Sequence, residues 1–123
     1  MIESAAPNIG KDQDLLTFVY DAFNRRDIEP ILAVMDSNVE WPNGMEGGWV
    51  HGREEVRTYW LRQWKVLDPQ VVPVRFEKDE EGRVVVHVKQ LVRDLHGTIL
   101  LDRIVRHVYT IKSGLIRRMD IQE

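Results

Sequence analysis

One stretch of this chain, Ile99 to Ile111, constrains its structure more than any other. In a strand, alternate side chains point to opposite faces. The odd-numbered face of this stretch is the more apolar of the two, yet Arg103 and His107 lie in the middle of it. Burying such groups without partners costs free energy. The stretch therefore predicts a strand whose inner face holds an imidazole and a guanidinium that need a neighbour, a water or a ligand.

Apolar residues at three-to-four spacing predict helices in the first half of the chain, and alternation with a period of two predicts strands in the second half. Pro73 indicates an edge strand or a bulge near the start of the strand region. Helices followed by hairpin strands are typical of an α+β fold, with an antiparallel sheet covered by helices on one side. The expected helices cover residues 12–26, 28–35 and 53–67, and the expected strands cover 39–41, 72–76, 84–93, 99–111 and 115–121.

The helical stripes are the expected core. The first stripe contains Leu15, Val19, Ala22 and Phe23, with Phe18 beside them. The third helix has a stripe with three aromatic residues, which is typical either of an ordinary core face or of a ligand wall. Its members are Val56, Tyr59, Trp60, Gln63, Trp64 and Leu67.

Length and composition predict one globular domain over residues 1–123, with residues 1–11 as a loose lead-in. The net charge of −3 gives no long-range field for nucleic acid or an anionic membrane, so neither is an expected partner. The sequence shows no membrane span and no secretion signal, and we expect a soluble cytoplasmic protein.

The four histidines, His51, His87, His96 and His107, fall in different expected elements, and none has the short spacing to another ligand that metal sites show. Cysteine is absent, which excludes disulfides and thiolate sites. No phosphate-binding loop or nucleophile motif is present. We therefore expect no metal and no cofactor.

Three stretches carry a family resemblance: Phe18–Pro42, His51–Val56 and Arg106–Met119. With them the chain resembles the nuclear transport factor 2-like superfamily, and specifically its SnoaL-like members, which include polyketide cyclase-like and ketosteroid isomerase-like proteins. The resemblance implies a cystatin-like cone, in which a curved antiparallel or mixed sheet wraps against three helices and a pocket opens between them. It also implies a homodimer through the outer face of the sheet, where Leu100, Ile104 and Val108 form an apolar patch.

The catalytic sets of two relatives are not retained. Where a ketosteroid isomerase has its base, its tyrosine and its oxyanion-holding acid, this chain has Trp41, Val19 and His107. Where a limonene-epoxide-hydrolase-like protein has its Asp-Arg-Asp set, the chain has His107, Val105 and Ile121. Neither mechanism is therefore expected.

SnoaL-like cyclases use an aspartate on the final strand, and Asp120 is close to that place. Alternation puts Asp120 on the outer face, opposite Met119. A bulge of one residue would reverse this orientation, so the sequence leaves the direction of Asp120 open.

The expected catalytic residues are His107, as an acid or base near neutral pH, and Arg103, which could hold an oxyanion together with or in place of Gln90. Each has a plainer account: a structural histidine bonded to a neighbour, an arginine paired with a surface acid, and a glutamine that caps an internal water. The expected ligand-binding residues are Trp41, Tyr59, Trp64, Gln90, Tyr109 and Met119.

These observations predict a small-molecule-pocket protein for an apolar, polycyclic or aromatic compound. If it is an enzyme, the reaction is acid/base chemistry next to a carbonyl, as in a metal-free isomerase or a cyclase-like lyase. The alternative is a non-catalytic module of the same fold that binds a ligand or another protein. A third reading is a filled cone, in which Trp41, Trp60 and Trp64 pack together and leave no cavity.

Overall fold

The computed structural model describes residues 9–123, so the first eight residues of the expected lead-in lie outside the described part of the chain. The first helix begins at Ile9 and not at Asp12, because Ile9 already packs against the hydrophobic core. The elements in chain order are α1 (Ile9–Asn24), α2 (Ile28–Ala33), β1 (Met35–Pro42), β2 (Trp49–His51), α3 (Gly52–Trp64), β3 (Leu67–Lys78), β4 (Val84–Asp94), β5 (Ile99–Lys112) and β6 (Leu115–Gln122).

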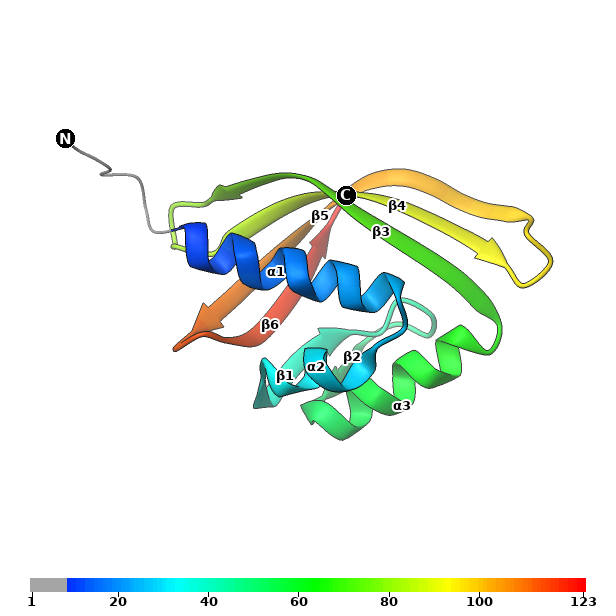
Figure 1. Cartoon of the computed structure of the whole chain (residues 1–123), viewed down its shortest axis with the longest axis horizontal. Coiled ribbons are helices and arrows are strands. Elements are labelled where there is room, and N and C mark those ends of the chain that lie inside the picture. Colours follow the sequence, from blue (N-terminus) through cyan, green and yellow to red (C-terminus); the bar gives the residue numbers. More distant parts are fainter. Residues whose placement is uncertain (1–8) are drawn as a thin grey trace.

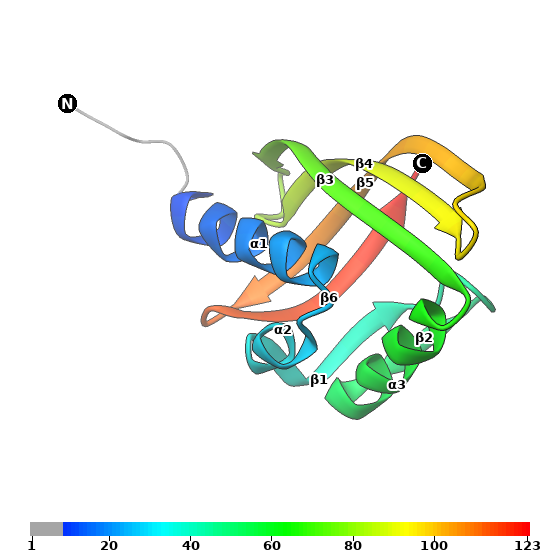
Figure 2. The same ribbon diagram turned by 45° about the vertical axis from the view of Figure 1, so that its right-hand side comes forward.

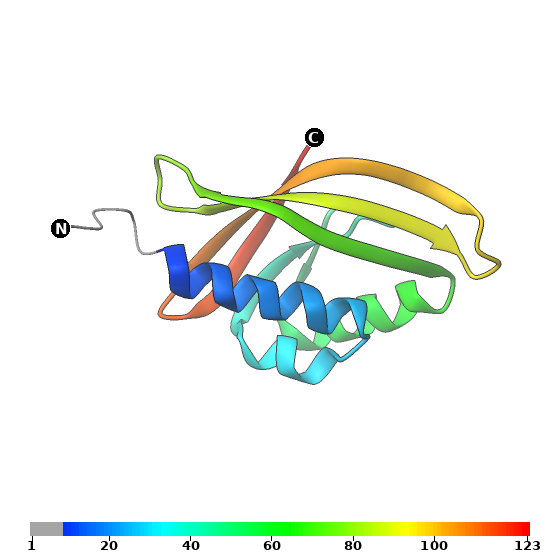
Figure 3. The ribbon, with the colours of Figure 1, turned by 45° about the horizontal axis from the view of Figure 1, so that its top comes forward.

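The six strands form one sheet in the order β2-β1-β6-β5-β4-β3. All neighbours are antiparallel except β1 and β6, which run parallel, so the sheet is mixed. Figure 1 shows the three helices on one side of the sheet, and Figures 2 and 3 show the sheet bending around α1 without closing into a barrel. The expected α+β fold, a curved sheet against three helices, is confirmed.

The inward face of α1 is broader than the expected stripe and includes Leu16 and Tyr20. Leu16, Val19, Tyr20 and Phe23 have the i, i+3, i+4, i+7 spacing of a single helix face, and they lie against the core. The four members of the expected stripe are confirmed as core residues, since Val19 and Ala22 are buried and Leu15 and Phe23 pack against them, but Phe18 is 41% exposed. The consequence is that Tyr20, and not Phe18, points into the molecule.

The elements between α2 and β3 also differ from the prediction. β1 begins at Met35, before the expected strand 39–41 and inside the expected helix 28–35, because Met35 pairs with Ile116 of β6. The glycine-rich loop contains a short strand, β2, which pairs with the end of β1. Helix α3 ends at Trp64, and Leu67 already begins β3.

Two register shifts set the direction of side chains. β3 is an edge strand with a shift between Pro73 and Arg75, as Pro73 predicted. In the pairing of β5 with β6, Thr110 faces Arg118 and Ile111 faces Ile116, so the extra residue is Arg117. The bulge turns Ile116 into the core, although unbroken alternation would put it on the outer face with Asp120. The alternation beyond Arg118 stays intact.

The outer face of the sheet carries part of the expected apolar patch. Ile104 is 64% exposed and Leu100 is exposed, but Val108 is only 1% exposed and cannot belong to such a patch. Leu100 also reaches the interior cavity described below. The homodimer through this face stays a prediction. None of the helices within residues 9–123 has the length and apolar character needed to cross a membrane.

Candidate functional site

A cavity of about 320 Å³ lies between the helices and the concave face of the sheet. This volume is in the range of small-molecule sites, about 300–1,000 Å³. Its wall is mostly apolar and is built from α1, α3, the loop after β1, and strands β1 and β3–β6. The indoles of Trp41 and Trp60 pack edge to face at 5.4 Å between ring centroids. The cavity lies beside this aromatic cluster, so the tryptophans do not fill the interior.

His107 lies in the wall of the cavity and is the only buried polar or charged residue of the described chain, with 6% of its surface exposed. Strand β5 directs it inward together with Arg103, Val105 and Tyr109, as the alternation predicted. Its Nδ1 lies 2.8 Å from the hydroxyl of Tyr20. The neighbour that this buried imidazole requires is therefore a tyrosine of α1.

The hydrogen bond to His107 belongs to a chain of three side chains. The Tyr109 hydroxyl donates to the Tyr20 hydroxyl at 2.8 Å. The proton of Tyr20 is then left for Nδ1 of His107, which acts as the acceptor. A neutral imidazole that accepts at Nδ1 carries its own proton at Nε2. All three residues line the cavity.

Burial keeps the three members of this chain neutral. Burial, together with a smaller effect from the positive charge of Arg103, lowers the pKa of His107 to about 4. Burial also raises the pKa of Tyr20, an effect to which Tyr109 adds, and it raises the pKa of Tyr109 well above its ordinary value. At neutral pH these three side chains therefore carry no charge, but they hold protons that can be donated.

Arg103 lies toward the mouth of the cavity, where 36% of its side chain is exposed. Its Nε donates to Oε1 of Gln90 at 3.1 Å, from the facing position of β4. One of its terminal nitrogens lies 3.0 Å from a carboxylate oxygen of Glu123. Arg103 and Gln90, the residues predicted to hold an oxyanion, thus lie together in the cavity wall. Glu123 is also present as a surface acid paired with Arg103, which is the alternative role that the sequence left open for this arginine.

Four of the expected wall residues, Trp41, Tyr59, Tyr109 and Met119, line the cavity with Gln90. The Tyr59 hydroxyl accepts a hydrogen bond from the backbone N–H of Gly44 at 3.0 Å, which ties the loop after β1 to α3. Trp64 is not among the lining residues. It packs against Phe23 and Trp60, which do line the cavity, with ring centroids at 5.3 and 6.1 Å.

Tyr20 is the functional residue that sequence reasoning missed. The signal was present, because Leu16, Val19, Tyr20 and Phe23 form a complete helical face. A tyrosine has a polar tip, so a stripe defined by hydrophobicity does not include it. Its role became visible only when β5 brought His107 and Tyr109 to the same point.

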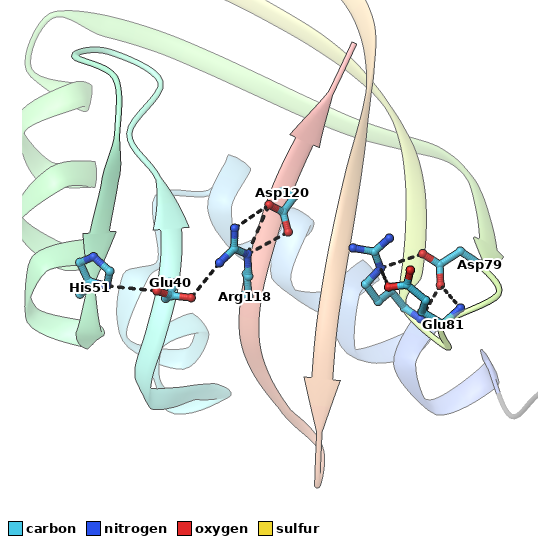
Figure 4. Close-up of polar contacts among 7 residues, drawn as sticks. Glu40, His51, Asp79, Glu81, Arg118 and Asp120 are labelled. Atoms are coloured by element: carbon cyan, nitrogen blue, oxygen red, sulfur yellow. Dashed lines mark hydrogen bonds and ion pairs between the residues drawn. The ribbon is translucent and has the colours of Figure 1, made fainter.

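Asp120 points away from the cavity, on the outer face of the sheet. Its carboxylate accepts hydrogen bonds from Arg118, whose other partner is Glu40 at 3.0 Å. Figure 4 shows this ladder of side chains crossing from His51 through Glu40 and Arg118 to Asp120. The indole of Trp49 covers the Arg118 guanidinium at 4.3 Å. Asp120 therefore belongs to an ion-pair network on the outer face and does not contact the cavity.

Solved structures share this fold. An NTF2-like protein of unknown function from Burkholderia pseudomallei is 25% identical over 92% of this chain and 90% of its own, with a TM-score of 0.79. TerC, crystallised with polyporic acid, is 29% identical over 91% and 90%, with a TM-score of 0.78. A candidate polyketide cyclase from Xanthomonas campestris is 20% identical over 90% and 88%, with a TM-score of 0.77, and shows the fold alone.

No curated protein matches the chain in sequence. The family model for the SnoaL-like domain, however, matches residues 17–119, which include the second half of α1, the loop after β1, and the hydrogen-bonded residues Tyr20, His107 and Tyr109. The resemblance expected from the sequence is confirmed: this chain belongs to the SnoaL-like domain family.

Proposed function

We propose that the chain binds a small, largely apolar carbonyl compound in the cavity and catalyses a proton transfer next to that carbonyl. The observation that carries the proposal is the buried His107, held at Nδ1 by Tyr20 and lining an apolar cavity. This arrangement directs an Nε2–H at the ligand. An N–H donor in a desolvated cavity stabilises the negative charge that develops on a carbonyl oxygen as the adjacent carbon loses a proton.

The hydrogen-bonded side chains of Tyr109, Tyr20 and His107 suit a proton transfer that leaves no charge on the protein. Tyr109 and His107, at the two ends of this set, both line the cavity. As Nε2 gives its proton to the carbonyl oxygen, Nδ1 takes the proton of Tyr20, and Tyr20 takes that of Tyr109. The Tyr109 oxygen accepts the proton that leaves the ligand carbon. The ligand is converted from keto to enol form, and the protein stays neutral, as burial requires. The proton of His107 then lies on Nδ1, and the reverse transfer restores the starting tautomer.

A non-catalytic ligand-binding module is the second candidate, and a specific observation favours it. Among the described residues, the cavity wall contains no aspartate or glutamate to act as a strong base. A histidine with a pKa of about 4 is itself a weak base at neutral pH. The same cavity would then hold its ligand without changing it.

Hydrogen exchange separates the two candidates. The α-hydrogens of α-tetralone, an apolar bicyclic ketone, exchange with deuterium oxide at a rate that proton NMR measures. We expect the protein to accelerate this exchange, and we expect His107→Gln and Tyr109→Phe to remove the acceleration while the affinity for the ketone is retained. Binding without acceleration in the unchanged protein would establish the non-catalytic module instead.

The ligand of TerC gives a second probe for the cavity. Polyporic acid was crystallised with that protein, whose chain is 29% identical to this one. Binding of polyporic acid, measured by the quenching of fluorescence from Trp41 and Trp60, would support a cavity for multi-ring compounds. A failure of both probes to bind at millimolar concentration would count against the proposed function.

A further inference from the structure

The charge of the cavity wall points to a narrower class of ligand. Within residues 9–123 the lining contains no acidic side chain and no lysine, and Arg103 is its one permanently charged group. The remaining polar lining groups are amides, hydroxyls and the neutral imidazole. In a wall of low dielectric, a cation with no acidic group beside it in the wall attracts an anionic ligand and repels a cationic one.

The counter-ion of Arg103 does not belong to the cavity. Glu123 is 72% exposed and pairs with Arg103 from the solvent side. Ion pairs between such exposed groups contribute little stability, about 0–1 kcal/mol. An incoming acid group can therefore replace Glu123 at little cost, and it would meet a guanidinium that Gln90 already holds in place.

The geometry of β5 places Arg103 and His107 along one line. Both face the cavity, and they are four residues apart with continuous pairing to Gln90 and Val86 of β4. A strand rises about 3.3 Å per residue, so their Cα atoms are about 13 Å apart. Arg103 lies near solvent, whereas His107 is deeply buried. A ligand that reaches both has two polar ends and a flat or apolar body between them.

We propose that the ligand is an amphipathic acid: an apolar body of one or more rings, with an ionised acid group held by Arg103 at the cavity mouth and a carbonyl directed toward His107. This assignment rests on the proposed function and adds the charge, the orientation and the length of the compound. Arginine suits the role, because its planar guanidinium keeps several donors free after Gln90 and Glu123 have each taken one.

A matched pair of compounds tests the assignment by calorimetry. para-Benzoylbenzoate has an acid group and a ketone at opposite ends of a ring, and its methyl ester differs in the charge. We expect the acid to bind about tenfold more tightly than the ester, the size of one hydrogen bond to a charged group. Raising the salt concentration should reduce this preference but should leave ester binding unchanged.

Single substitutions test whether Arg103 causes the preference for the acid over the ester. Arg103→Met should abolish it, Arg103→Lys should retain most of it, and Arg106→Met, on the outer face of the same strand, should leave it intact. Glu123→Gln should strengthen acid binding about threefold by removing the competing carboxylate, and Glu80→Gln, in an exposed turn, should have no effect. Circular dichroism checks that each variant is folded.

The outcomes distinguish this inference from the proposed function. Equal binding of acid and ester, or a preference that Arg103→Met leaves unchanged, would overturn the anionic ligand while the cavity keeps its role. Binding of neither compound would overturn both.

Discussion

The hydroxyl of Tyr20 lies 2.8 Å from Nδ1 of His107, although 87 residues separate the two in the chain. The contact joins α1 to the concave face of β5, and it occupies the one buried imidazole of the described chain. Tyr109 completes it from the same strand by donating to Tyr20. The bonds fix the tautomer of His107 and add a polar link between the helical layer and the sheet.

Removing the Tyr20 hydroxyl should destabilise the fold. In Tyr20→Phe, Nδ1 of His107 and the hydroxyl of Tyr109 both lose their partner, and unsatisfied buried groups cost about 1–3 kcal/mol each. We expect the free energy of unfolding, from urea denaturation at pH 7, to fall by about 2 kcal/mol or more. Tyr109→Phe is the control, because it keeps the bond between Tyr20 and His107. Tyr109→Phe should lower the free energy of unfolding by about half as much as Tyr20→Phe. Equal losses in the two variants would contradict the order of hydrogen bonds from Tyr109 through Tyr20 to His107.

Acid should unfold the protein through His107. The pKa of this histidine is about 4 in the folded state, against 6.5 for an ordinary histidine, so the unfolded state binds more protons between these values. Stability is therefore fully present above about pH 6.5 and is lost as the pH falls toward 4. From pH 7 to pH 5 the loss due to this group is about 2 kcal/mol.

Urea denaturation of the wild type and of His107→Gln at pH 7 and pH 5 isolates this effect. Glutamine does not titrate, so the variant should lose about 2 kcal/mol less than the wild type over the same interval. The other titrating groups are common to both proteins and cancel in the comparison. The same loss in both would mean that His107 is not held neutral by burial.

The sequence predicted those features that depend on local pattern. Alternation in 99–111 placed Arg103, His107 and Tyr109 on one face, and Pro73 indicated the irregular edge of the sheet. The prediction from the sequence failed where contacts between distant elements determine the local structure. The start of β1 is a strand because β6 pairs with it, and Ile116 turns inward because of a bulge at Arg117.

The candidate site was predictable in part for the same reason. Its strand residues follow from a period of two, but the partner of His107 comes from a helix whose orientation no local pattern gives. Trp64 was expected in the wall, since it shares a helical face with Tyr59 and Trp60. Helix α3 ends at that residue, and Trp64 packs against Phe23 and Trp60 without reaching the cavity lining.

The loop after β1 should loosen when the Tyr59 hydroxyl is removed. This hydroxyl accepts the N–H of Gly44 at 3.0 Å, and Gly44 lines the cavity. In Tyr59→Phe the Gly44 amide loses its partner, so its hydrogen exchange should become faster, by about tenfold for a bond of ordinary strength. The Gly47 amide, which donates to the Asn43 carbonyl at 2.8 Å, is the internal control and should change little. Unchanged exchange at Gly44 would show that the bond does not restrain the loop.

Neighbouring residues of β6 provide the sharpest test of which face is functional. Met119 is buried in the cavity wall, whereas Asp120 belongs to the ion-pair ladder on the outer face (Figure 4). Met119→Ala removes wall contacts and should weaken the binding of α-tetralone severalfold, with a loss of stability of about 3 kcal/mol. Asp120→Asn should leave both affinity and hydrogen exchange of the ketone unchanged and should cost at most about 1 kcal/mol, because its ion pair is partly exposed. Loss of exchange in Asp120→Asn would mean that this carboxylate acts on the ligand after all, and the neutral chain from Tyr109 to His107 would lose its catalytic role.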